Sequence, residues 1–170
     1  MKPLLLLLLI GSSSVFAQNA SLPADTTQWM NFWVGEWQLN WIDANGKAAT
    51  GENSITKLWD GKVIQENFKG LSGQNAGYEG KSWSVYDARA KKWKQTWVDS
   101  QGGYLDFVGG VEGENRFFER QVINRNGKTI TMRMTFHDIT PDRFAWDWAS
   151  SNDDKKTWQP IWQITYTRKK

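Results

Sequence analysis

One polar pair near the end of the chain has a direct chemical use. Tyr166 and Arg168 stand two residues apart, and on a β-strand this spacing places both side chains on one face. A hydroxyl and a guanidinium side by side can hold a carboxylate or a similar anionic head group. A second interpretation stays open, in which Arg168 stacks on an aromatic ring and Tyr166 bonds to the backbone.

His137 is the one histidine in the sequence. It shares strand parity with Thr131, Arg133 and Thr135, so we expect it on the polar, solvent-facing side of its strand. A haem ligand would have to point into the interior. We therefore expect no haem ligation through His137, and no other cofactor.

Other catalytic chemistry has few candidates. Cysteine is absent, which excludes disulfides, thiol nucleophiles and cysteine zinc sites. The sequence has no glycine-rich phosphate loop and no serine in a G-x-S-x-G pattern. Among the 18 carboxylates, four fall within or at the end of predicted strands, namely Asp99, Asp106, Glu119 and Asp147. We predict no catalytic residue and no metal site, and the residues favour a binding protein over an enzyme.

The elements that carry these residues are predicted to be strands. Apolar and polar residues alternate in short segments separated by turn residues such as Asn45-Gly46, Asp60-Gly61 and Asn126-Gly127. Such turns are too short for crossover helices, so the strands must be antiparallel. About ten strands are expected, over residues 37–41, 54–59, 63–68, 81–87, 93–99, 104–108, 117–123, 129–137, 143–149 and 158–168.

Ten successive strands favour a closed up-and-down β-barrel, because closure removes unpaired sheet edges. A two-sheet sandwich is the alternative. Only one segment has helical spacing: Asp25 can cap a short helix in which Trp29, Phe32 and Trp33 form one apolar face. We expect this helix to plug one end of the barrel.

Strand parity predicts an aromatic interior, because most of the 12 tryptophans of the chain fall at inward positions of the predicted strands. The expected inner set is Trp37, Leu39, Trp41, Trp83, Val85, Trp93, Trp97, Met132, Met134, Phe136, Phe144, Trp146, Trp148, Trp162, Ile164 and Tyr166. Large rings can either fill a barrel or line a ligand cavity, and both remain open. If a cavity exists, the expected ligand-binding residues are Trp41, Trp97, Trp146, Trp148, Tyr166 and Arg168.

The first 17 residues have the pattern of a secretory leader. Lys2 precedes an apolar run over residues 4–10, and Val15-Phe16-Ala17 resembles a cleavage site. We expect cleavage after Ala17, a single domain over residues 18–170, and a periplasmic or secreted protein. No run approaches the length of a membrane-spanning helix. The net charge of +3 is small and dispersed, so no nucleic-acid partner is expected; the oligomeric state stays open.

Gly35-Glu36-Trp37, which follows the short aromatic helix, resembles the G-x-W signature of calycins, the superfamily of lipocalins and fatty-acid-binding proteins. The resemblance implies that Arg168 lies across Trp37 and closes the barrel, with Gly35 as part of this structural closure. Further segments resemble an exported bacterial calycin-like family of unknown function: 97–100, 102–103, 109–110 and 150–158. The chain lacks the cysteines and the later T-D-Y type motif of true lipocalins.

Together these features predict an exported protein that holds a small hydrophobic or aromatic molecule in a tryptophan-lined barrel. One alternative is a glycan-binding module with exposed tryptophan platforms. Another is an enzyme that uses two carboxylates, which would require two acids converging in one cleft.

Overall fold

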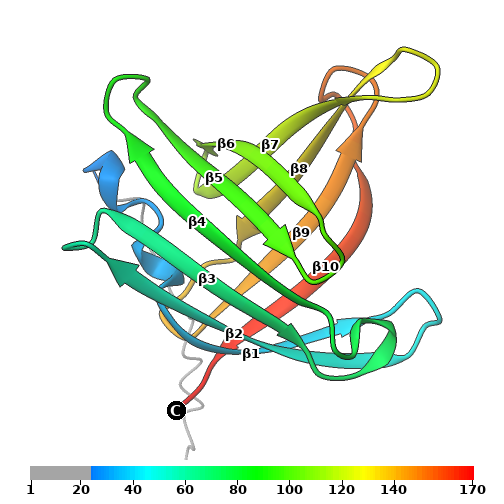
Figure 1. Ribbon diagram of the computed structural model, residues 1–170, viewed down its shortest axis with the longest axis horizontal. Coiled ribbons are helices and arrows are strands. Elements are labelled where there is room, and N and C mark those ends of the chain that lie inside the picture. The colour runs from blue at the N-terminus through cyan, green and yellow to red at the C-terminus, as the bar shows by residue number, and fades with distance from the viewer. Residues whose placement is uncertain (1–23) are drawn as a thin grey trace, which may run out of the picture.

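The computed structural model describes residues 24–170, so the predicted leader lies outside the described residues. The strands are β1 (Gly35–Ile42), β2 (Ala48–Leu58), β3 (Val63–Gly70), β4 (Glu79–Asp87), β5 (Lys92–Asp99), β6 (Tyr104–Glu112), β7 (Asn115–Ile123), β8 (Thr129–His137), β9 (Arg143–Ser151) and β10 (Gln159–Arg168). Each pairs antiparallel with its neighbour in sequence, and β1 pairs with β10, which closes the barrel (Figure 1). The predicted up-and-down barrel is confirmed, and the sandwich alternative is wrong.

The hairpin turns follow from their side chains. Asp43 accepts hydrogen bonds from the backbone N–H groups two and four residues ahead, at 2.9 and 3.0 Å. Asn124 does the same, at 2.9 Å for both. Gly46 and Gly127 take positive φ angles of 72° and 74° in these turns, a conformation that costs glycine little. Short polar side chains and glycine thus fix where β1 and β7 end.

The barrel is less tightly paired at two seams. β1 and β10 share four registered residue pairs and β6 and β7 share five, whereas the other neighbours share six to eight. Both seams pair at the end where β1 begins and diverge toward the opposite end. The barrel is therefore more completely paired at one end than at the other. We call the end where β1 begins the closed end, and the other the open end.

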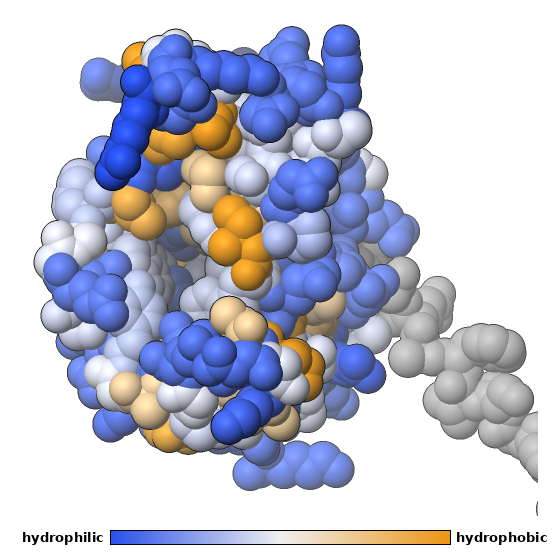
Figure 2. Space-filling model, turned by 90° about the vertical axis from the view of Figure 1, so that its right-hand side faces the viewer, coloured by the Kyte–Doolittle hydropathy of each residue, from blue (hydrophilic) through white to orange (hydrophobic). Residues whose placement is uncertain are grey.

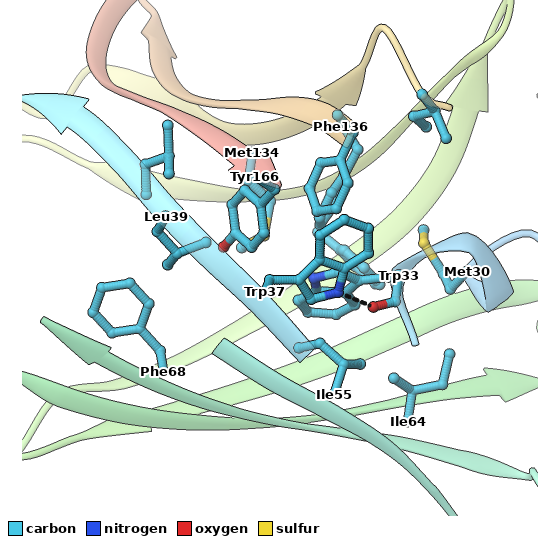
Figure 3. Packing of buried hydrophobic residues seen from close by; sticks show 14 of the residues in the cluster. Met30, Trp33, Trp37, Leu39, Ile55, Ile64, Phe68, Met134, Phe136 and Tyr166 are labelled. Atoms are coloured by element: carbon cyan, nitrogen blue, oxygen red, sulfur yellow. Dashed lines mark hydrogen bonds between the residues drawn. The ribbon is translucent and has the colours of Figure 1, made fainter. Parts of the chain in front are cut away.

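Two short 3₁₀ turns, η1 (Thr26–Gln28) and η2 (Asn31–Trp33), cover the closed end. They replace the predicted single helix, and Met30 and Trp33 become fully buried. The indole N–H of Trp93 donates to the Thr26 carbonyl at 2.8 Å. Trp37 Nε1 donates to the Trp33 carbonyl at 2.7 Å, the dashed line in Figure 3. These bonds tie the plug to the barrel wall. In residues 24–170 no helix is long and apolar enough to cross a membrane. A third 3₁₀ turn, η3 (Gly73–Asn75), lies between β3 and β4.

Trp37 and Arg168 meet at the closed end, where the guanidinium carbon lies 4.2 Å from the centre of the indole. Arg168 also donates to the backbone carbonyls of Pro141 at 2.7 Å and Val34 at 3.0 Å. A Cβ atom at Gly35 would collide with this guanidinium. Glycine at that position is therefore what allows the arginine to lie across the tryptophan.

The predicted inner set is wrong on β4. Ser82 and Ser84 are fully buried, and the alternation of the strand then places Trp83 and Val85 on the outer wall. The physical reason is that the interior next to β4 is polar, since Gln95 donates to both serine hydroxyls. Hydrophobicity alone assigned the strand to the wrong face.

Candidate ligand cavity

A cavity of about 210 Å³ lies inside the barrel, and Trp33 of η2 is among the residues that line it. An engineered cavity of about 150 Å³ in another protein holds benzene, whereas drug-sized ligands occupy about 300–1,000 Å³. The interior is therefore not completely filled. Its volume suits a molecule with one or two rings, and porphyrins exceed it. Figure 2 looks on the open end, where a hollow lies among mostly hydrophilic residues.

Five indole rings line the cavity. Trp33 is buried, whereas Trp97, Trp146, Trp148 and Trp162 are half-buried, so the cavity is within reach of solvent at the open end. The rings hold one another edge to face: the Trp146 and Trp162 centroids are 5.7 Å apart, and Trp148 lies 5.9 Å from Phe107. Such contacts fix the orientation of the rings.

Of the residues expected to bind a ligand, Trp97, Trp146, Trp148 and Tyr166 line the cavity. Trp41 does not line it. Its ring packs edge to face against Trp162 at 5.4 Å, which makes it a support for the wall.

Asp99 positions two rings at the rim. Its Oδ2 accepts a hydrogen bond from Trp97 Nε1 at 3.1 Å and from the Tyr78 hydroxyl at 3.0 Å. The backbone N–H of Gly103 donates to Oδ1 at 2.9 Å, and this bond lowers the pKa of Asp99. Burial, followed by the hydrogen bond to Asp99, raises the pKa of Tyr78 to about 12. Asp99 is therefore ionised at neutral pH and acts on the rings as a fixed acceptor.

Part of the cavity lining is polar. We call the following set the polar wall: Glu66, Gln95 and Tyr166, which line the cavity, and the buried residues hydrogen-bonded to them, Asn53, Ser82 and Ser84. Asn53 Nδ2 donates to Glu66 Oε1 at 2.7 Å, and Ser82 Oγ donates to Glu66 Oε2 at 2.6 Å. Asn53 Nδ2 also donates to the Tyr166 hydroxyl at 3.2 Å. Three strands thus converge on one carboxyl group, with a tyrosine of a fourth strand beside it.

Glu66 is the centre of the polar wall and is 7% exposed. Burial raises the pKa of its carboxyl to about 7, and the hydrogen bonds from Ser82 and Asn53 only partly oppose this. Burial likewise raises the pKa of Tyr166, and the nearby Glu66 adds to the effect. At neutral pH the cavity therefore holds a carboxyl group close to its midpoint of ionisation and a neutral phenol.

Sequence reasoning missed Glu66, although a signal was present. Glu66 stands between Ile64 and Phe68 in the alternation of β3, so it occupies an inward position in an otherwise apolar series. Gln95 stands in the same way between Trp93 and Trp97. A charged residue at an apolar parity position is unusual, because its burial is costly unless it is partnered.

Arg168 does not line the cavity. Although it shares a strand face with Tyr166, it lies at the closed end, where its guanidinium is engaged by Trp37 and by backbone carbonyls. The structure therefore does not bring Tyr166 and Arg168 to a common ligand. Of the two interpretations of this pair, the structure has the one in which Arg168 stacks on an aromatic ring.

The other candidate residues lie away from the cavity. His137 is on the outer wall, with Nδ1 2.8 Å from Asp138 and Nε2 3.2 Å from Asp147. Glu119 pairs with Arg133 at 2.7 Å. Glu66 is the only carboxylate of residues 24–170 that lines the cavity. Over the same range, no group of three or more acidic or histidine side chains is placed to hold a metal ion.

No protein-family model matches the chain, and no curated protein matches it. Among solved structures, a redesigned β-barrel is similar, with 10% sequence identity, a TM-score of 0.43, and coverage of 82% of this chain and 94% of that one. A likeness of this size assigns neither a family nor an activity.

Proposed function

We propose that this protein binds a small hydrophobic or aromatic molecule inside its barrel. The observation that carries the proposal is the cavity of about 210 Å³ with five indole rings in its lining. Indoles offer flat apolar surfaces on which a ring or short acyl chain can stack. The polar wall supplies the few polar groups that orient a ligand in most small-molecule sites.

A calycin-like ancestry and export are part of the proposal. The Trp37 and Arg168 contact at the closed end supports the first, and the sequence pattern of residues 1–17 supports the second. Mass spectrometry of protein recovered from the periplasm or medium should give a chain that begins at Gln18. A chain that keeps residues 1–17 would refute cleavage after Ala17.

A titration with 2-phenylethanol tests binding in the lumen, because this probe is small, neutral and does not absorb where tryptophan is selectively excited. Tryptophan fluorescence and isothermal calorimetry should both report saturable binding. Trp148→Ala removes a wall of the cavity, and we expect it to weaken binding about tenfold, the equivalent of one lost aromatic contact. Trp83→Ala is the matched control, because the alternation of β4 places Trp83 on the outer wall. A loss of binding in Trp83→Ala with none in Trp148→Ala would refute the proposal.

Glycan binding on outer tryptophans is the alternative, and one residue favours it. Trp59 is 73% exposed in the turn between β2 and β3, where an exposed indole can stack on a sugar ring. Titration with oligosaccharides separates the two functions. A response abolished by Trp59→Ala and retained in Trp148→Ala would favour the glycan module over the lumen.

A further inference from the structure

Glu66 is a buried carboxylate without a counter-ion. Its two hydrogen-bond partners, Asn53 and Ser82, are neutral. Within residues 24–170, no lysine, arginine or histidine forms an ion pair with it, and no cation contributes to its pKa shift. Buried carboxylates are ordinarily paired with a cation or a metal. The cavity on which Glu66 opens is therefore the place from which a positive charge can reach it.

The polar wall also has unused acceptors. Asn53 Oδ1 and Gln95 Oε1 are buried and have no hydrogen-bond partner. A carboxylate has about four acceptor positions, and two of those on Glu66 are occupied. Glu66 and Gln95 both line the cavity, and Asn53 lies behind Glu66. A ligand that meets this wall must bring donors.

The faces of the indole rings favour the same ligand chemistry. Tryptophan faces attract cations more strongly than the faces of the other aromatic residues, and Trp97, Trp146 and Trp148 line the cavity together with Glu66. A carboxylate ligand would instead place a negative charge beside Glu66, which is unfavourable in a partly desolvated site.

We propose that the natural ligand is a small aromatic or hydrophobic amine, whose ammonium group donates to Glu66 and Gln95 while its apolar part packs against the indoles. This inference rests on the proposed function and adds the chemical class of the ligand. The ammonium group supplies both the missing counter-ion and the missing donors.

Amine binding should depend on pH, because the ammonium group requires the ionised form of Glu66. The titratable side chains coupled electrostatically to this carboxyl are two phenols, Tyr166 of β10 and Tyr78 before β4. The pKa of each is raised, so neither changes charge near neutrality. On the neighbouring strands, Asn53 of β2 and Ser82 and Ser84 of β4 face the carboxyl and are neutral. Lys69 of β3 is exposed.

Three probes of nearly equal size and different charge test the inference: 2-phenylethylamine, 2-phenylethanol and phenylacetate. For the unaltered protein at pH 8 we expect calorimetry to give at least tenfold tighter binding of the amine than of the alcohol, and the weakest binding for the acid. Amine affinity should fall on the order of 100-fold between pH 8 and pH 5, about tenfold per pH unit below the midpoint of Glu66. Affinity for the alcohol should stay constant.

Glu66→Gln keeps the shape of the side chain and removes its charge. In this variant we expect the amine preference and its pH dependence to disappear while the alcohol still binds. Equal binding of amine and alcohol by the unaltered protein, or preference for the acid, overturns the inference and leaves the proposed function standing. If none of the three probes binds, the proposed function fails and the inference fails with it.

Discussion

Glu66→Gln should change the pH dependence of folding stability in a way that can be worked from the structure. Burial raises the pKa of Glu66 from 4.5 to about 7. The folded protein therefore holds the proton more tightly than the unfolded chain does. As the pH rises from below 4.5 to above 7, the unfolded chain ionises first, and the folded state loses relative stability.

The magnitude follows from the shift of about 2.5 pKa units between those two values. One unit corresponds to about 1.4 kcal/mol, so ionisation of Glu66 should lower the free energy of unfolding by about 3 kcal/mol across this pH range. The loss should be complete above the folded pKa and absent below the unfolded one. Glutamine cannot ionise, so the variant lacks this contribution at every pH.

Urea denaturation of both proteins at intervals from pH 4 to pH 8.5 measures the effect. The difference in unfolding free energy, unaltered protein minus Glu66→Gln, isolates Glu66 because the other carboxylates contribute to both proteins. We expect this difference to fall by about 3 kcal/mol as the pH rises. A difference that stays flat or rises with pH would show that Glu66 is not held in an uncompensated buried site.

Three further substitutions test the structural framework. Trp37→Ala deletes a fully buried indole and should cost about 3–5 kcal/mol in urea denaturation; a cost below about 1 kcal/mol would contradict its place in the core. Gly35→Ala should destabilise by about 1–3 kcal/mol, because the φ of 140° and the Arg168 guanidinium both oppose a side chain. In a double-mutant cycle, Gly35→Ala should cost less in the Arg168→Ala background, because the guanidinium that collides with the added Cβ atom is then absent. Strictly additive effects of the two substitutions would refute the collision. Arg168→Ala should lower the thermal midpoint yet leave calorimetric affinities for phenylacetate and 2-phenylethanol unchanged, and a selective loss of phenylacetate binding would restore the anchor role.

The strand pattern was predictable because most strands carry large apolar side chains on one parity only. In β1 the inward residues Trp37, Leu39 and Trp41 alternate with polar neighbours, and all three are buried. The turn residues Asp43 and Asn124 then mark the strand ends through bonds to their own backbone. Local chemistry and burial agree in these segments, so the sequence is sufficient to predict these strands and their ends.

The strand β4 was not predictable by the same rule. Its buried positions are Ser82 and Ser84, and its large apolar residues Trp83 and Val85 face outward. The assignment depends on Gln95 of β5, which donates to Ser84, and on Glu66 of β3, which accepts from Ser82. Such pairings join residues far apart in sequence, and a single strand carries no sign of them.

The candidate site was predictable in its aromatic half alone. Trp97, Trp146 and Trp148 follow from parity, and they line the cavity. Glu66 was missed because a carboxylate is ordinarily assigned to the surface. The anchor expected at Arg168 was misplaced because parity gives the face of a strand and not the height along the barrel.

The most direct test of amine binding beside Glu66 is a crystal structure of the protein from crystals grown with 2-phenylethylamine. We expect density for the phenyl ring among Trp146, Trp148 and Trp162, with the nitrogen within hydrogen-bond distance of the Glu66 carboxylate. Density for the amine on the outer wall beside Trp83, or side chains that close the cavity and leave no room for the probe, would contradict it.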